Sequence, residues 1–229
     1  MTKPVPFLQG FVLMSSSPEK PEADSAYRID ENCPQFEPIE DVPGLPRVLL
    51  IGDSISIGYT FPVRQLLAGR ANLHRVPENA GPTARGLEAI DAWLGDGDWD
   101  VIHFNFGLHD IKFMPDGKRQ VSGPDYESNL TALVARLKET GAALIWATTS
   151  PVPAGNLSPV RRTDDVVAYN GIALGIMRRE DIAINDLYVF ALARIDQIQL
   201  PENVHFTDEG SELLAEPVAA CIEAAISNK

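Results

Sequence analysis

From residue 47 onward, short apolar runs alternate with longer stretches of helical periodicity, and this alternation restricts the fold more than any other feature of the sequence. The apolar runs are typical of buried strands, and they occupy residues 48–51, 73–76, 101–106, 142–148 and 182–184. The other stretches predict helices, which occupy residues 62–69, 83–94, part of 126–139, 164–178 and 208–226. Thr207 stands where it could cap the last of these helices.

Strands that are separated by helices pair in parallel, through right-handed crossovers. We therefore expect a parallel five-stranded sheet with helices on both faces, which is a three-layer α/β/α sandwich. In such sheets, ligands bind beyond the carboxyl ends of the strands. The residues that directly follow each strand are therefore the first candidates for a functional site.

The first 46 residues differ from the rest of the chain, because they hold eight of the eighteen prolines and show no sustained strand or helix period. We expect residues 1–46 to form a Pro-rich arm that packs on or precedes the body, and residues 47–229 to form one domain. An apolar stretch near the N-terminus resembles a signal peptide, but Pro4, Pro6 and Gln9 interrupt it. We expect it to stay uncleaved and the protein to be cytoplasmic by default, with an extracytoplasmic location left open.

Charge and hydropathy argue against a nucleic-acid-binding protein and against a membrane-spanning protein. The 229 residues include 19 Lys and Arg against 32 Asp and Glu, a net charge of −13 that repels phosphate backbones, so we expect no nucleic-acid partner. No window approaches the roughly 18 consecutive apolar residues of a transmembrane helix. Cys33 and Cys221 allow either one disulfide or two free thiols, and the oligomeric state is left open.

Gly52-Asp53-Ser54 follows the first strand and is typical of a sharp turn into a helix. This turn would place the Ser54 hydroxyl at the mouth of the sheet, near a helix N-terminus, where it could act as a nucleophile. The alternative is that Ser54 only caps the following helix. Neither glycine-rich phosphate-binding motif is present, so we expect no phosphate-binding loop.

The turns after the second and third strands contain candidate hydrogen-bond donors. Asn79 and Gly81 precede the helix at 83–94, and a glycine there can offer its backbone N–H to an anion. Gly107-Leu108-His109-Asp110 follows the third strand. His109 could donate a hydrogen bond, act as a base or bind a metal, or it could simply pair with Asp110 in a loop.

Near the C-terminus, Glu202 stands three residues before His205. A carboxylate at this spacing can fix the orientation and tautomer of an imidazole, which is the third role in a serine triad, or the two can form only a surface salt link. If Glu202 does not serve, Asp208 and Asp186 are the next candidate acids.

For the other two histidines, the sequence predicts packing in the core or contact with solvent, and not a catalytic role. His74 falls on an edge strand and His103 falls within the third strand. A metal site built from His103, His109 and Asp110 is a minor alternative. We expect no metal ion and no cofactor.

In this order, the serine, the glycine, the Gly-x-x-Asp loop and the late acid and histidine resemble the SGNH hydrolase superfamily with its Gly-Asp-Ser (GDSL) signature, over residues 47 to about 226. The resemblance implies the flavodoxin-like SGNH hydrolase fold. It makes Ser54 the nucleophile, His205 the base and Glu202 the orienting acid. It also implies an oxyanion hole, formed by Ser54, Gly81 and His109. The residues that it implies as supporting are Asp53, Asn79, Gly107 and Asp110.

Two residues depart from the pattern of that superfamily. Its third block is usually Gly-x-Asn-Asp, with the Asn side chain as an oxyanion donor, and here His109 takes that place. Its last block is usually Asp-x-x-His, and here the acid is Glu202. A neutral imidazole can still donate from one nitrogen if an acceptor holds the other, and Asp110 is the expected partner.

The resemblance implies a serine esterase or deacylase that forms an acyl-enzyme on Ser54. We expect short-chain acyl esters, specifically acetyl esters, most readily on carbohydrates, so the partner is a small-molecule or saccharide ester. One alternative is an enzyme of the lysophospholipase or thioesterase type. The other is a catalytically poor binding protein on the same scaffold.

Overall fold

The structure is a computed structural model in which residues 33–228 are described. Its sheet consists of β1 (Arg47–Ile51), β2 (Asn72–Arg75), β3 (Val101–Phe104), β4 (Ala143–Ala147) and β5 (Ala183–Asn185). All neighbours pair in parallel, in the order β2-β1-β3-β4-β5. The predicted parallel five-stranded sheet is therefore confirmed. The strand order reverses between β1 and β3, and ligands of open α/β sheets bind at such a reversal.

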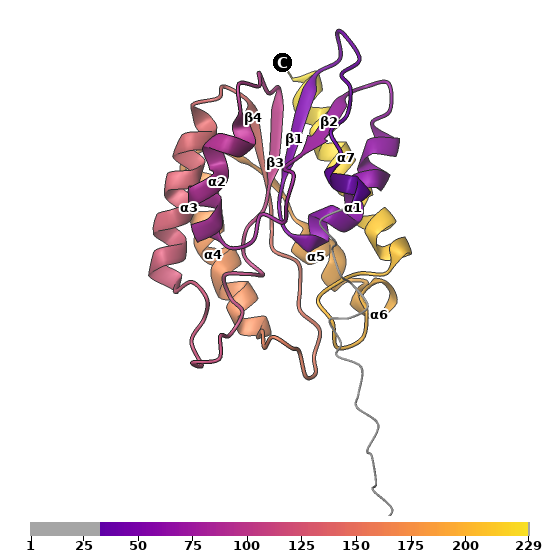
Figure 1. Cartoon of the computed structure of the whole chain (residues 1–229). Coiled ribbons are helices and arrows are strands. Elements are labelled where there is room, and N and C mark those ends of the chain that lie inside the picture. Colours follow the sequence, from indigo (N-terminus) through magenta and orange to yellow (C-terminus); the bar gives the residue numbers. More distant parts are fainter. Residues whose placement is uncertain (1–32, 229) are drawn as a thin grey trace, which may run out of the picture.

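Helices cover both faces of the sheet (Figure 1). The pair α1 (Ser54–Leu66) and α7 (Asp208–Ser227) packs together on one face, next to the short helices α5 (Leu187–Leu192) and α6 (Ile195–Ile198). On the other face, α2 (Thr83–Leu94), α3 (Gly123–Lys138) and α4 (Thr163–Arg179) lie side by side. The three-layer α/β/α sandwich is thus confirmed.

One predicted helix boundary is wrong, and three short elements were not predicted. Helix α1 begins at Ser54, not at Pro62, because Asp53 caps it and Pro62 is accommodated inside the helix. Proline favours the first helical position, which is why the sequence suggested a later start. The helices α5 and α6, and the 3-10 turn η1 (Pro34–Phe36), were not predicted, because they are too short to show a period.

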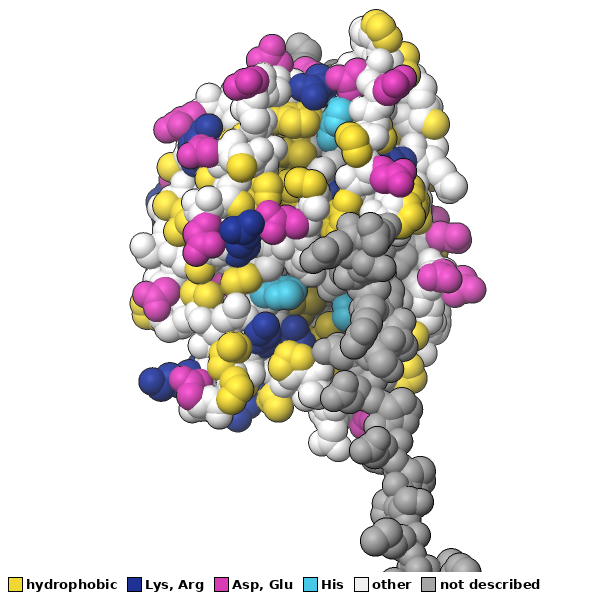
Figure 2. All heavy atoms as spheres, viewed as in Figure 1, with side chains coloured by type: hydrophobic (Ala, Val, Ile, Leu, Met, Phe, Trp, Pro, Cys, Tyr) yellow, Lys and Arg dark blue, Asp and Glu magenta, His cyan; other side chains and the backbone are white. Residues whose placement is uncertain are grey.

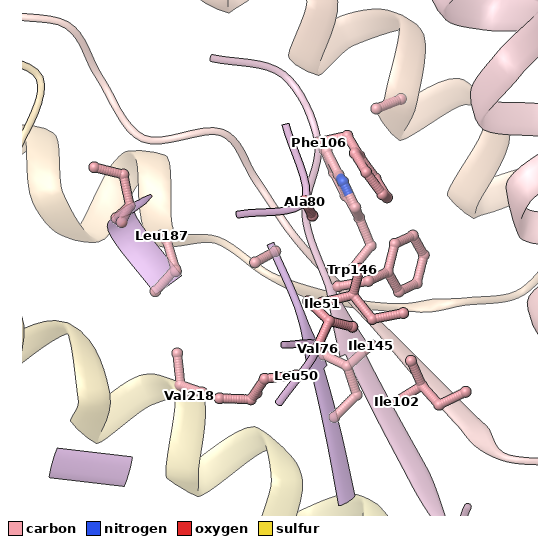
Figure 3. Packing of buried hydrophobic residues seen from close by; sticks show 14 of the residues in the cluster. Leu50, Ile51, Val76, Ala80, Ile102, Phe106, Ile145, Trp146, Leu187 and Val218 are labelled. Carbon is pink, nitrogen blue, oxygen red and sulfur yellow. The ribbon is translucent and has the colours of Figure 1, made fainter. Parts of the chain in front are cut away.

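The core lies on both sides of the central strands. β3 is buried at all four positions, and β1 and β4 are buried at their last four, as expected for a parallel sheet that is covered on both faces. Figure 3 shows Leu50, Ile102, Ile145 and Trp146 packed around these strands. This core holds the carboxyl ends of β1 and β3 in fixed positions.

His103 is the polar exception in β3, and it is packed, as expected. It is 1% exposed, and burial lowers its pKa to about 4. Its Nε2 lies 3.2 Å from Nδ2 of Asn185 in β5, and its ring meets the edge of Tyr59. A neutral imidazole that accepts from an amide satisfies this buried position.

Residues 33–46 contact the edge of the sheet at β2. The Asn72 side chain donates to the carbonyl oxygens of Val42 and Leu45 and accepts from the Val42 N–H. Asp41 pairs with Arg47 and with Nε2 of His74 on the edge strand. The stretch that resembles a signal peptide lies outside the described residues. Cys33 and Cys221 are free thiols, and no helix within residues 33–228 is long and apolar enough to cross a membrane.

Candidate active site

The Gly52-Asp53-Ser54 turn packs closely against the start of α1. A Cβ on Gly52 would lie 2.8 Å from Oγ of Ser56, so a larger residue there would have to displace this side chain. Asp53 is the N-cap of α1, and its Oδ1 accepts from the Ile55 N–H at 3.0 Å. The alternative in which Ser54 caps the helix is therefore wrong. Ser54 is the first helical residue, and the N–H groups of a first turn have no acceptor within the helix.

The Ser54 hydroxyl meets His205. Oγ of Ser54 lies 2.9 Å from Nε2 of His205, and the two residues are 8% and 9% exposed. His205 stands just before α7, which Thr207 caps by accepting from the Gly210 N–H, as predicted. A serine hydroxyl and an imidazole at this distance have the geometry that a nucleophile and its base need for acyl transfer.

The partner of Nδ1 of His205 differs from the prediction. Oδ1 of Asn203 lies 2.7 Å from Nδ1 and also accepts from the His205 backbone N–H at 3.0 Å. Glu202 has a positive φ of 51°, and its carboxylate accepts instead from the Asn156 N–H at 3.5 Å. The predicted contact between Glu202 and His205 is thus corrected to Asn203, because this turn aims the next side chain at the ring.

The two other candidate acids do not take this role either. Asp186 caps α5, where it accepts from the Val189 N–H and from the Thr148 hydroxyl. Asp208 is the first residue of α7, in the turn that Thr207 caps. The group at Nδ1 of His205 is therefore the amide oxygen of Asn203. Because this oxygen can only accept hydrogen bonds, a neutral His205 donates to it from Nδ1, and its Nε2 is left to accept from the Ser54 hydroxyl.

Gly81 and His109 line one groove of about 600 Å³. Its other lining residues are Glu78, Asn79, Pro82, Ala84, Arg85, Glu88 and Gln120. Gly81 has a φ of +63°, which favours glycine, and its N–H donates to Oδ1 of Asn79 at 3.0 Å. The predicted donor is therefore already engaged, and an oxyanion would have to share it with Asn79. Figure 2 shows histidine side chains at the surface of the molecule, close to Lys and Arg side chains.

The surroundings of His109 favour the neutral form of its imidazole. Burial lowers the pKa of His109, and although Asp53 opposes this shift, Arg161, Lys112 and His205 add to it. The charge of Asp53, and a proton on His205 when it is present, both affect the pKa of His109, so the ring lies within electrostatic range of the Ser54 turn. A neutral ring there keeps one N–H that can be donated.

Asp110 does not pair with His109, contrary to expectation. It is fully buried, and its Oδ1 accepts from the backbone N–H and the hydroxyl of Thr83, at 2.9 and 2.6 Å. Burial raises the pKa of Asp110 to about 7. Because Thr83 begins α2 two residues after Gly81, Asp110 ties the Gly81 turn to the His109 loop. Gly107 supports the same loop, since a Cβ there would lie 2.0 Å from Oγ1 of Thr149.

Sequence reasoning missed Arg75, which lies beneath the nucleophile turn. Its guanidinium donates to Oγ of Ser56 at 2.8 Å and to the Gly52 carbonyl at 2.9 Å. Arg75 is 8% exposed, and desolvation lowers its pKa to about 10. A lone arginine at the end of the strand 73–76 was the available signal, because a buried cation needs several acceptors.

Within residues 33–228, no three His, Cys, Asp or Glu side chains are grouped in a way that could hold a metal ion. The alternative metal site of His103, His109 and Asp110 is not assembled. His103 faces Asn185 and Tyr59, while Asp110 faces Thr83.

Three solved structures resemble this fold at low sequence identity. The lipase/acylhydrolase from Enterococcus faecalis is 19% identical with a TM-score of 0.69, and the match covers 79% of this chain and 96% of that one. The acetylxylan esterase Axe2 from Geobacillus stearothermophilus is 18% identical with a TM-score of 0.62, over 76% and 93%. TesA is 15% identical with a TM-score of 0.63, over 78% and 99%. At this identity the likeness establishes the fold alone.

No curated protein sequence matches the chain significantly. The model of the GDSL-like lipase/acylhydrolase family, however, matches residues 50–213, which include the Ser54 turn, the groove and His205. This span is well over half of the chain, and its fold is that of the SGNH hydrolases. The protein therefore belongs to the GDSL-like lipase/acylhydrolase family, within the SGNH superfamily of carboxylic ester hydrolases.

Proposed function

We propose that the protein is a serine esterase that hydrolyses short-chain acyl esters, most readily acetyl esters on carbohydrates, through an acyl-enzyme on Ser54. The observation that carries the proposal is the 2.9 Å contact between Oγ of Ser54 and Nε2 of His205. A helix-capping serine would not need this contact. The assembled pair also argues against a catalytically poor binding protein.

In the first half of the reaction, Oγ of Ser54 attacks the ester carbonyl carbon while Nε2 of His205 takes the hydroxyl proton. Asn203 accepts from Nδ1, so it holds the ring in the tautomer whose Nε2 is a base. The tetrahedral intermediate then collapses. The imidazolium gives its proton to the departing alcohol, and an acyl group remains on Ser54.

In the second half, water attacks the acyl-enzyme. His205 takes a proton from that water and returns it to Oγ of Ser54 as the carboxylic acid leaves. The balance is one water consumed for one alcohol and one acid released. Ser54 and His205 need no other reactant for these steps.

The oxyanion of each intermediate needs fixed donors. The candidates are the backbone N–H groups of Ser54 and Gly81 and the neutral ring N–H of His109. Removing one such donor typically slows acylation by about 10²- to 10³-fold. Because the Gly81 N–H is shared with Asn79, we expect His109 to contribute more than Gly81 does.

The carbohydrate part of the proposal is supported by the groove. Its walls carry carboxylate, guanidinium and carboxamide groups, which can hydrogen bond to hydroxyls, next to Gly81 and His109. Two acetylxylan esterases share the fold. A small acyl group with a large polyhydroxyl alcohol fits an open groove that carries these hydrogen-bonding groups better than a long acyl chain does.

A second candidate, a longer-chain acylhydrolase of the lysophospholipase or thioesterase type, is favoured by a different groove of about 660 Å³. This groove is lined largely by apolar side chains, including Phe113, Met114, Leu157 and Val160. It could hold an acyl chain. The likeness to the fold of TesA agrees with this candidate.

Hydrolysis of a matched ester series tests the proposal. We expect 4-nitrophenyl acetate and acetylated xylo-oligosaccharides to be hydrolysed, and the octanoate to be a poorer substrate than the acetate. Ser54→Ala is the control for adventitious hydrolysis. A clear preference for the octanoate would favour the second candidate, and no hydrolysis of any ester would contradict both.

A further inference from the structure

Resting on the proposed function, we propose that the groove beside Gly81 is the subsite for the sugar part of the ester, and that Gln120 determines specificity by hydrogen bonding to a sugar hydroxyl. Gln120 lines this groove together with the ion pair of Glu78 and Arg85.

Gln120 is held rigidly at the base of a hairpin that comes after His109. Its backbone N–H donates to the Lys112 carbonyl at 2.9 Å, and the next N–H, of Val121, donates to the Asp110 carbonyl at 3.0 Å. A bridge between Phe113 and Arg119 closes the hairpin. The side chain is therefore placed by backbone hydrogen bonds and not by a flexible loop.

The carboxamide of Gln120 lacks the partner that a buried polar group normally has. Its Oε1 is buried, and it accepts no hydrogen bond among the described residues. A buried unpaired amide oxygen is unfavourable. Gln120 lines the groove, so a rotation of its carboxamide toward a bound hydroxyl would give this oxygen the partner that it lacks.

The charged part of the groove lining is preorganised. Arg85 contacts both carboxylate oxygens of Glu78, at 2.8 and 3.1 Å, and Nε1 of Trp93 donates to the same carboxylate at 2.9 Å. Glu88 adds a second contact to Arg85 at 3.3 Å. These fixed groups present acceptors and donors toward a polyol without a further loss of side-chain entropy.

The lining of the groove suits it to the alcohol of the ester. Gly81 and His109, the expected oxyanion donors, are part of that lining, so a carbonyl bound to them lies within the groove. An acetyl group occupies little space beyond the carbonyl. The larger sugar, which leaves as the alcohol, is the part that the rest of the groove, with Gln120 and Arg85, would hold.

The test compares two substrates on one variant. The variant is Gln120→Leu, which removes both hydrogen-bonding atoms at nearly constant size. The substrates are methyl xylopyranoside monoacetate, which offers hydroxyls, and 4-nitrophenyl acetate, which offers none. We expect kcat/KM for the sugar acetate to fall about tenfold, mainly through KM, as the loss of one or two neutral hydrogen bonds predicts. The aryl acetate should change far less.

Gln65→Leu is the matched control, because Gln65 is an exposed glutamine in α1 that does not line the groove. Gln120→Ala serves as a second variant in case leucine perturbs the hairpin, and melting temperatures report folding. An equal loss on both substrates, or a sugar acetate rate within twofold of the Gln65→Leu rate, would overturn the inference.

The failure of the inference can be told apart from the failure of the proposed mechanism. Turnover of the aryl acetate without turnover of the sugar acetate overturns the sugar subsite and leaves the acyl-enzyme mechanism intact. Full activity of Ser54→Ala on both substrates overturns the mechanism, whereas the comparison between Gln120→Leu and Gln65→Leu still decides the subsite.

Discussion

Nε2 of His205 lies 2.9 Å from Oγ of Ser54, although 151 residues separate the two in the sequence. The sheet explains this contact, because Ser54 comes after β1 at the point where the strand order reverses, and His205 precedes the helix α7 that packs against α1. The groove with Gly81 and His109 belongs to the turns after the neighbouring strands. Nucleophile, base and candidate donors thus come from four separate parts of the chain.

The orienting residue of His205 is the first point to test. Because Oδ1 of Asn203 contacts Nδ1 and Glu202 turns toward Asn156, we expect Asn203→Ala to lower kcat by at least about tenfold through loss of the correct tautomer. Glu202→Ala should keep kcat within about threefold of wild type. Steady-state kinetics on an acetyl ester measure both.

Asn203→Asp is the matched control, since a carboxylate can accept from Nδ1 as well as an amide oxygen can. It should retain or exceed wild-type activity. Loss of activity in Glu202→Ala but not in Asn203→Ala would restore Glu202 as the orienting acid and contradict the geometry at Nδ1 of His205.

Residues at strand ends could be predicted from the sequence, whereas contacts that depend on turn conformation could not. Ser54, Gly81 and His109 were found because each comes after a recognisable strand, and the carboxyl ends of parallel strands meet at one edge of the sheet. The Asn203 contact depends on the positive φ of Glu202, and the Asp110 contact depends on where α2 begins. Neither property is visible in residue spacing.

We expect His109 to stabilise the transition state of the reaction, and not only the structure of its loop. If its neutral ring N–H stabilises the oxyanion, His109→Ala should lower kcat by an amount equal to about 2 to 4 kcal/mol of transition-state stabilisation, with little change in KM. His109→Asn restores a short amide donor and should retain far more activity than His109→Ala. Measurement of kcat and melting temperature for both variants distinguishes a role in the reaction from a role in loop stability. Equal rate losses that accompany equal stability losses would remove His109 from the oxyanion hole.

Asp110 should make stability depend on pH. Burial raises its pKa in the folded protein to about 7, whereas an unfolded aspartate ionises near pH 4. Between these values the folded state holds a proton that the unfolded state has lost, so this contribution to stability is fully present below about pH 4 and is lost as the pH rises through about 7. The free energy of unfolding of wild type, relative to Asp110→Asn, should therefore fall from pH 4 to pH 8. A difference that is constant with pH, measured by urea unfolding, would contradict this expectation.

Activity should survive exhaustive chelation. The proposed steps use only Ser54, His205 and backbone or side-chain donors, and the described residues hold no cluster of metal ligands. Turnover of an acetyl ester after dialysis against a chelator should match that of the untreated enzyme. Loss of turnover that a divalent ion restores would instead indicate a metal-dependent reaction.

The acyl-enzyme on Ser54 is tested most directly by rapid mixing with 4-nitrophenyl acetate and then mass spectrometry of the quenched protein. We expect wild type to gain the mass of one acetyl group, located on the peptide that contains Ser54, and to release a burst of nitrophenol if deacylation is the slower step. Ser54→Ala should keep its fold and show neither acetylation nor turnover. Turnover by Ser54→Ala above a tenth of the wild-type rate, or acetylation at another residue that accounts for turnover, would contradict the account.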